Sequence, residues 1–326
     1  MHTVLKRIMT TLTILSVIAG TAFGAGQGEA EAVAETADTP EPVTVRFAEV
    51  AWTDIVATTA STRLVLEAIG YDTTAVMVAV PMAYEGMAGG DVDVFLGNWM
   101  PSMATIANRY FDEGTVIMNR ANLEGAKYTL ATPTYMAEQG LTSFADIADF
   151  AEELDSTIHG IEPGNDGNQL ILDMIAEDAF GLGDFSLAES SEAGMLAEAQ
   201  ARAQQEEPIV FLGWAPHPMN NYLDMEYLSG GDDYFGPDYG AATVYTNTRA
   251  GFLEAYPNLE RFFDNLYFTL EMEGAIMGAI DDGIDAEVAA EEWLRENPAI
   301  LEDWFDGVQD LDGNPALETV RAELGI

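Results

Sequence analysis

A strand that ends at a tryptophan constrains the fold of this chain most strongly. Residues 92–96 form a short apolar run typical of a buried strand, and the run leads directly into Gly-Asn-Trp-Met-Pro at residues 97–101. Trp99 is therefore expected where the strand runs out into a loop. An indole in that position is either a core anchor or one wall of a cleft, where its negative face attracts a cation. Trp99 alone does not decide between the two.

The surrounding chain alternates between strand-like and helix-like segments. Residues 43–47 alternate apolar and polar side chains, as a half-buried strand does, and lead into an amphipathic stretch that Gly70 is well placed to end. Alternation at this spacing predicts an α/β layered fold. Further strands are expected at 75–80, near 116, at 126–131, at 157–161, at 208–213 and at 242–245, and helices from Pro81, over 170–180 and over about 192–205.

Two further tryptophans share the setting of Trp99. Trp52 follows the strand pattern at 43–47 and precedes a helix, and Trp214 follows the apolar run at 208–213. In open α/β sheets ligands bind outside the carboxyl ends of the strands, so three indoles at such ends can meet in one aromatic cage. Cages of this kind bind quaternary ammonium groups by cation–π attraction. Chance placement of the three rings is the alternative.

These motifs, in this order, resemble the substrate-binding proteins of glycine betaine/choline ABC transporters, and in particular the periplasmic choline-binding branch. The resemblance rests on residues 43–54, 97–101 and 213–217 and extends over about 43–315. It implies an α/β, type II-like periplasmic binding protein with two lobes, a ligand cleft between them, a hinge of two crossovers, and ABC permease subunits as partners. The expected domains are lobe 1 over 42–128 and 236–326, and lobe 2 over 129–235.

The same resemblance implies which residues bind the ligand. Tyr128 falls where the family completes its aromatic box, and Asp54 and Asn165 fall at polar positions beside it. Each also has an ordinary structural explanation: Asp54 suits the first turn of a helix, Asn165 suits a turn or an N-cap, and Tyr128 suits a strand core. The predicted ligand-binding residues are Trp52, Asp54, Trp99, Tyr128, Asn165 and Trp214, with Asn98, Asp166 and Asn168 as further candidates.

The chemistry of these residues favours choline over glycine betaine. Betaine carries a carboxylate that calls for Arg, Lys, His or backbone N–H donors, whereas choline offers a hydroxyl and no negative charge. The motifs supply Asp54 but no arginine. Their cationic candidates are His217 and Lys127, and Lys127 is expected on the opposite face of its strand from Tyr128. Glycine betaine or another betaine is the alternative ligand, and acetylcholine carries the same quaternary ammonium group.

The N-terminus predicts export. Lys6 and Arg7 precede an apolar run over 8–18 and then small residues, which together indicate a cleaved signal peptide over 1–24. Residues 25–41 lack periodicity and are expected to form a flexible acidic tether. With no cysteine in the chain, disulfides, thiol chemistry and a lipid anchor are excluded. We therefore expect a soluble periplasmic protein, most simply a monomer.

The charge balance is extreme. The chain has 12 Lys and Arg against 56 Asp and Glu, and only two basic residues lie within the predicted signal peptide. Such a surface repels nucleic acid and anionic membranes. Attraction of a cationic ligand is one explanation. Adaptation to high salt is the favoured one, because a Debye length of about 3 Å in molar salt removes most of the self-repulsion.

An enzyme is the main alternative from another class of protein. Beyond the predicted signal peptide only His159 and His217 remain, and neither belongs to a Gly-x-Ser-x-Gly elbow or to the spacing of a metal site. We therefore expect no enzymatic activity, no metal and no cofactor. An exported hydrolase that uses a carboxylate pair is the remote alternative.

Overall fold

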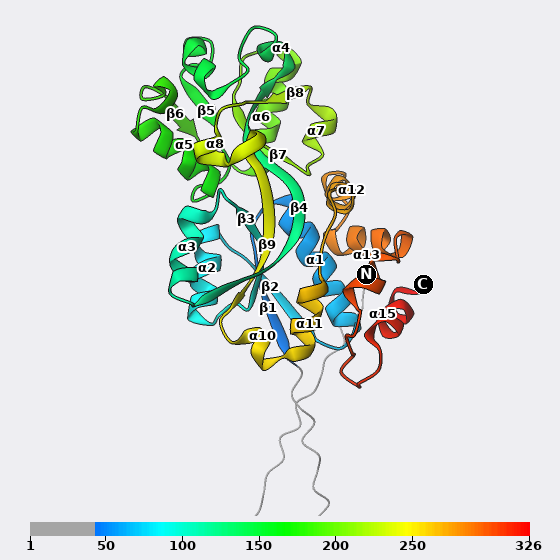
Figure 1. Cartoon of the computed structure of the whole chain (residues 1–326). Coiled ribbons are helices and arrows are strands. Elements are labelled where there is room, and N and C mark those ends of the chain that lie inside the picture. Colours follow the sequence, from blue (N-terminus) through cyan, green and yellow to red (C-terminus); the bar gives the residue numbers. More distant parts are fainter. Residues whose placement is uncertain (1–42) are drawn as a thin grey trace, which may run out of the picture. The chain divides into compact units, whose positions relative to one another are not determined.

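A single mixed sheet organises the computed structural model, which describes residues 43–326 (Figure 1). Its strand order is β2-β1-β3-β9-β4-β7-β5-β6, with β8 paired to β4. The predicted signal peptide and acidic tether lie outside the described residues. The strands are β1 (Thr44–Glu49), β2 (Asp72–Met77), β3 (Val94–Met100), β4 (Val116–Pro133), β5 (Thr157–His159), β6 (Ser186–Ala188), β7 (Phe211–Ala215), β8 (Met225–Tyr227) and β9 (Ala241–Arg249).

Two groups of parallel strands are joined by an antiparallel pair. β1 runs parallel to β2 and β3, and β5 runs parallel to β6 and β7. Between the groups, β9 runs antiparallel to both β3 and β4, and β4 runs antiparallel to β7. The two strands expected near 116 and at 126–131 are one strand of 18 residues, long enough to pair first with β9 and then with β7. β4 therefore links the two groups.

Helices connect the parallel strands and cover their faces, as parallel pairing requires. α2 and α3 lie on one side of β1–β3, and α1, α12 and α13 pack together on the other (Figure 1). The helices are α1 (Thr53–Ala68), α2 (Val80–Gly89), α3 (Ala104–Asp112), α4 (Thr134–Ala137), α5 (Asp166–Ala176), α6 (Glu192–Gln205), α7 (Met219–Tyr222), α8 (Asp232–Phe235), α9 (Pro237–Gly240), α10 (Phe252–Ala255), α11 (Pro257–Asn265), α12 (Leu270–Asp281), α13 (Ala286–Glu296), α14 (Ile300–Trp304) and α15 (Ala316–Leu324), with 3₁₀ helices η1 (Phe144–Phe150) and η2 (Ala179–Gly181).

The helix α1 is buried along most of its length, although its sequence is rich in threonine and serine. Thr58, Ser61 and Thr62 are buried because each hydroxyl donates to the backbone carbonyl four residues earlier. α1 can therefore lie against the sheet without leaving these hydroxyls unpaired. This contact places the start of α1 beside the end of β3.

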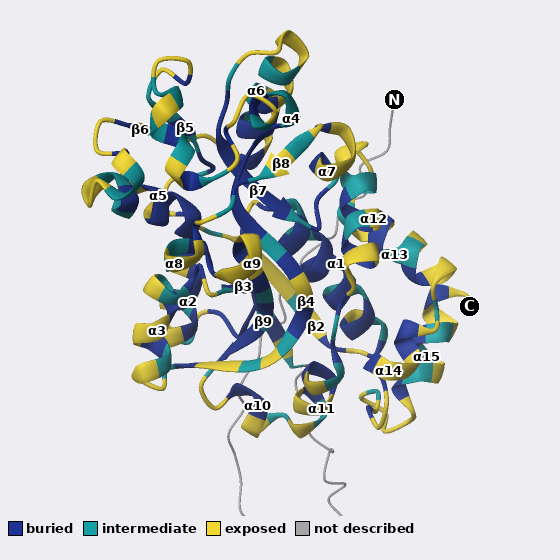
Figure 2. Ribbon diagram, turned by 45° about the horizontal axis from the view of Figure 1, so that its top comes forward, coloured by how far each residue is buried: buried dark blue, intermediate teal, exposed yellow. Residues whose placement is uncertain are grey.

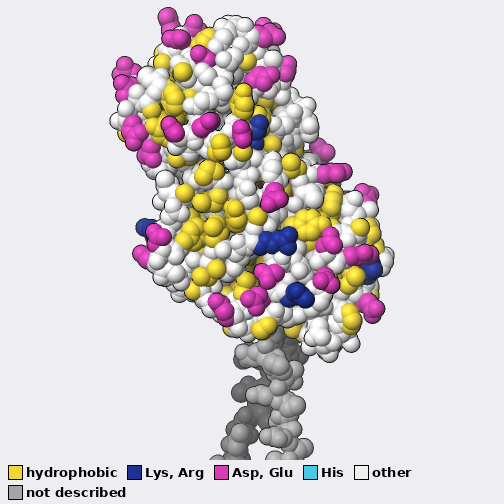
Figure 3. Space-filling view, in the orientation of Figure 1, with side chains coloured by type: hydrophobic (Ala, Val, Ile, Leu, Met, Phe, Trp, Pro, Cys, Tyr) yellow, Lys and Arg dark blue, Asp and Glu magenta, His cyan; other side chains and the backbone are white. Residues whose placement is uncertain are grey.

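Burial and charge are distributed as in a folded protein of acidic composition. The central strands are dark blue along much of their length in Figure 2, which marks the core, and Phe47, Phe95 and Phe211 are essentially inaccessible. Acidic side chains are scattered over the face drawn in Figure 3 and basic ones are few. Among residues 43–326, no helix is both long enough and apolar enough to span a membrane.

Candidate ligand-binding site

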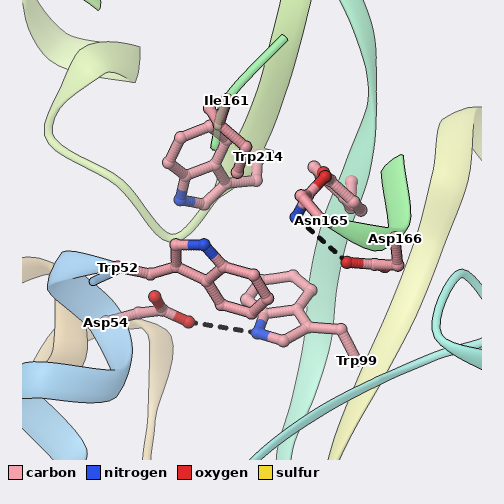
Figure 4. Close-up of a pocket in the computed structure, with 8 residues that line it drawn as sticks. Trp52, Asp54, Trp99, Ile161, Asn165, Asp166 and Trp214 are labelled. Atoms are coloured by element: carbon pink, nitrogen blue, oxygen red, sulfur yellow. Dashed lines mark hydrogen bonds between the residues drawn. The ribbon is translucent and has the colours of Figure 1, made fainter. Parts of the chain in front are cut away.

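A small cavity lies where α1, β3, β4, β7 and the start of α5 meet (Figure 4). All six residues predicted to bind ligand line it, although they are drawn from positions 52 to 214 of the chain. Asp166, one of the further candidates, and Ile161, which was not predicted, complete the lining. The full set is Trp52, Asp54, Trp99, Tyr128, Ile161, Asn165, Asp166 and Trp214.

Trp99 and Asp54 form one wall of the cavity. Trp99 lies within β3, opposite Val244 of β9, so the expectation that it follows the strand was wrong. The strand continues because β9 pairs with it beyond Gly97, which the sequence pattern cannot reveal. A Cβ on Gly97 would lie 2.7 Å from the side chain of Ile55, so the glycine permits close approach of α1. As a result, Trp99 Nε1 donates a hydrogen bond to Asp54 Oδ2 at 3.0 Å (Figure 4).

Trp52 occupies the N-cap position of α1, between β1 and the helix, as predicted. Ser, Thr, Asp and Asn are preferred there because their side chains accept a backbone N–H of the first turn, which an indole cannot do. The indole is instead held by a partner from a distant loop, since Trp52 Nε1 donates to Glu162 Oε1 at 2.7 Å. The orientation of this ring therefore depends on a carboxylate 110 residues away.

Tyr128 and Trp214 are directly paired residues of β4 and β7. Trp214 also lies within its strand and not beyond it, because pairing with β4 continues to Ala215. The ring centroid of Tyr128 is 6.3 Å from that of Trp214 and 6.1 Å from that of Trp99, both in edge-to-face orientation. Tyr128 therefore lies between Trp99 and Trp214 and contacts both rings.

Asn165 caps α5 and fixes the hydroxyl of Tyr128. Its Oδ1 accepts from the backbone N–H of Asn168 at 3.0 Å and from the Tyr128 hydroxyl at 2.9 Å, and its Nδ2 donates to Asp166 Oδ1 at 3.1 Å. Capping here starts the helix at 166, four residues earlier than expected from apolar periodicity. Position 167, the second residue of α5, must be glycine, because a Cβ there would lie 2.1 Å from the Tyr128 hydroxyl oxygen.

Burial raises the pKa of three carboxyl groups at or beside the cavity, those of Asp54, Glu162 and Asp166. The pKa of Asp54 rises to about 7, first because of burial and then because Glu192 is nearby. Burial likewise raises the pKa of Glu162 to about 7 and that of Asp166 to about 6. Asp166 Oδ2 has no hydrogen-bond partner among the described residues. A cation bound in the cavity would favour the charged form of all these groups.

None of the side chains that line the cavity is basic. Lys127 points away from it, as expected, with its ammonium nitrogen 4.9 and 5.4 Å from the ring centroids of Tyr227 and Tyr239. His217 is buried behind Trp214, with 4.9 Å between ring centroids. Residues 43–326 contain no group of three potential metal ligands. Aromatic rings and carboxyl groups without a counter-cation suit an organic cation.

The further candidates have mixed outcomes. Asp166 lines the cavity, and its signal was its place in the polar turn that begins α5. Asn98 is instead part of the interior, where its Oδ1 accepts from the hydroxyl of Tyr84. Asn168 braces the loop, because its side chain bonds both backbone groups of Ile161. Ile161 itself, an apolar residue after a short strand, gave no signal in the sequence.

The family model for the substrate-binding domain of ABC-type glycine betaine transport systems, OpuAC, matches residues 43–296. The chain belongs to this family. As a member of the OpuAC family it is a substrate-binding protein and not an enzyme, and its α/β fold is that of the type II periplasmic binding proteins, as predicted.

Three solved structures illustrate how similar this OpuAC-family protein is to its relatives. An ABC-transporter choline-binding protein in complex with choline is 52% identical, with a TM-score of 0.85, over 86% of this chain and 98% of that one. A choline-binding protein in an unliganded semi-closed conformation is 51% identical, with a TM-score of 0.80, over 87% and 99%. Lactococcal OpuAC in its closed conformation with glycine betaine is 26% identical, with a TM-score of 0.73, over 81% and 100%.

Proposed function

We propose that this protein binds choline in the cavity and delivers it to the permease subunits of an ABC importer. The main evidence is the lining of the cavity, which consists of four aromatic side chains, two carboxyl groups, Ile161 and Asn165 and contains no basic side chain. Trimethylammonium is attracted to indole and phenol faces, and carboxylates near it neutralise its charge. The 52% identity to a protein solved with choline supports the same ligand.

Glycine betaine is the second candidate, because the family model is named for its transport and a more distant relative was solved with it. Its carboxylate would enter a cavity lined by Asp54 and Asp166, where burial strengthens repulsion between like charges. Without a basic residue to offset this, betaine is expected to bind more weakly than choline.

The protein is proposed to close over its ligand as two lobes, residues 42–128 with 236–326 and residues 129–235. The switch of β4 from β9 to β7 near Tyr128 supports the first crossover. Hinge closure of this kind excludes water from the ligand and strengthens electrostatic contacts inside the site. Trp52, Asp54 and Trp99 would then approach the ligand from lobe 1, and Asn165 and Trp214 from lobe 2.

We also propose that residues 1–24 direct export to the periplasm and that the acidic surface is an adaptation to high salt. The spread of acidic side chains over the face in Figure 3, and not around one opening, supports salt adaptation over steering of a cation.

Calorimetric titration of the purified protein with choline and with glycine betaine tests this function. The expected result is binding of both with a clear preference for choline. Absence of heat with either ligand, at the salt concentration that keeps the protein folded, would refute binding of quaternary ammonium compounds. Tighter binding of betaine would refute the assignment to choline.

A further inference from the structure

Glu192, the first residue of α6, bonds to the start of α1. Its carboxylate accepts the hydroxyl of Thr53 at 2.5 Å and faces the backbone N–H of Thr53 at 3.3 and 3.4 Å. Trp52 gives α1 no side-chain cap, so Glu192 provides from 139 residues away the acceptor that an N-cap residue would normally provide. The negative charge also suits the positive end of the helix dipole.

The same carboxylate contacts the segment that follows β7. His217 Nδ1 accepts a backbone N–H two residues further on, so a neutral ring carries its proton on Nε2, which lies 3.4 Å from Glu192 Oε1. The imidazole packs edge-on against Trp214. Glu192 therefore lies behind two walls of the cavity, contacting Thr53 next to Trp52 and His217 next to the indole of Trp214.

Glu162 makes a second contact of this type through its hydrogen bond to the indole of Trp52. Neither Glu162 nor Glu192 lines the cavity, so neither is placed to touch the ligand. Both belong to the proposed lobe 2, whereas Trp52 and Thr53 belong to the proposed lobe 1. Separation of the lobes would break both contacts at once.

We infer that Glu162 and Glu192 are positioning residues that fasten lobe 2 to the start of α1, and so assemble the Trp52 and Trp214 walls when the protein closes. This inference rests on the proposed function and the proposed lobes. The closed arrangement brings the carboxylates of Glu162 and Glu192 close to the site that already contains Asp54. Glu192 and Asp54 repel each other there. A bound cation offsets this repulsion, which couples closure to the arrival of a cationic ligand.

The test uses distance measurements between spin labels, which the absence of native cysteine makes specific. Labels are placed at exposed positions of the two proposed lobes through Glu113→Cys and Glu153→Cys. Glu192→Ala removes the acceptor, while Glu192→Gln removes the charge but keeps an acceptor oxygen. Glu198→Ala is the matched control, because Glu198 lies on the same helix and, among residues 43–326, its side chain bonds only Arg202 of that helix.

With choline at saturation, the expected result for Glu192→Ala is a broader, longer interlobe distance and ligand dissociation at least about tenfold faster by stopped-flow tryptophan fluorescence. Glu192→Gln should recover part of this loss, and Glu198→Ala should match the wild type. Thr53→Val, which removes the donor hydroxyl and leaves Glu192 in place, should shift both readouts in the same direction.

Unchanged distance distributions and dissociation rates in both Glu192→Ala and Thr53→Val would overturn the inference. Because loss of the Glu192 contact destabilises the closed arrangement with or without ligand, the ligand-free distance distribution in Glu192→Ala is also expected to shift to longer values. A wild-type protein that binds no choline would refute the proposed function, and the ligand-free distances would still decide the role of Glu192. Circular dichroism of each variant separates these results from misfolding.

Discussion

Replacement of Asp54 by asparagine is the sharpest perturbation of the proposed site. Asparagine has nearly the same shape and keeps an oxygen that can accept the hydrogen bond now donated by Trp99 Nε1 at 3.0 Å. The position of the indole should therefore be preserved while one negative charge is removed. Any loss of choline affinity would then report the charge of Asp54 and not a collapsed cage.

The expected size of the effect follows from burial and charge. Unit charges about 5 Å apart attract by about 3 kcal/mol at an effective dielectric constant of about 20. The pKa of Asp54 is about 7 without ligand, so completing its ionisation at neutral pH costs about 0.4 kcal/mol. Allowing for desolvation of the cation, we expect Asp54→Asn to weaken choline binding by about 10- to 100-fold.

The assay is calorimetric titration with choline between about pH 5.5 and about pH 8.5. Wild-type affinity should fall as the pH drops below about 7, because the cation must then displace a proton from Asp54, which faces Glu192 and Glu273. Asp54→Asn should show a shallower fall, which arises from Glu162 and from Asp166, whose pKa is about 6. Equal affinities of the two proteins at about pH 8.5, or equal pH slopes, would refute the role of Asp54.

Three further predictions concern stability and the cage. Without ligand, the folded-state pKa of Asp54 lies above its ordinary value of 3.8. Stability from this group is therefore complete below that value and lost as the pH rises through about 7, so Asp54→Asn should raise the unfolding temperature at about pH 8 far more than at about pH 4. An equal rise at both would contradict this. Trp214→Ala should weaken choline binding by at least about 2 kcal/mol, or about 30-fold, and Trp214→Phe by less. Trp293→Phe, at a position that does not line the cavity, is the control in the same calorimetric assay. Gly167→Ala should displace the Tyr128 hydroxyl, which lies 2.1 Å from the added Cβ, and lower choline affinity about tenfold. Wild-type affinity would show that the tyrosine can move without consequence.

Local patterns in the sequence were sufficient for elements that depend on local physics. The helix expected over 192–205 is α6 with those bounds, because Ser191 caps its first turn through a hydrogen bond to the N–H of Gly194. The length of β4 was not predictable, since it reflects pairing with β9 and β7, strands more than 70 residues away in the sequence. The same long-range pairing places Trp99 and Trp214 inside strands.

Prediction of the site depended on residue chemistry and family resemblance together. The three tryptophans were found because each follows a strand pattern that is visible in the sequence. Tyr128, Asp54 and Asn165 were assigned through the resemblance to the family, because each also has an ordinary structural explanation. Glu162 and Glu192 were not found, because acidic residues are abundant in this chain and only the fold brings these two to Trp52 and Thr53. Ile161 likewise became recognisable only once its neighbours in space were known.

The central claim is that the cavity recognises a positive charge and not merely a shape. Calorimetric comparison of choline with 3,3-dimethylbutan-1-ol, its neutral carbon analogue of nearly the same shape, tests this claim most directly. Cation–π attraction worth about 2 kcal/mol predicts that the alcohol binds at least about 30-fold more weakly than choline. Equal affinities for the two compounds would contradict this claim, because the cavity would then recognise the shape of the ligand and gain nothing from its positive charge.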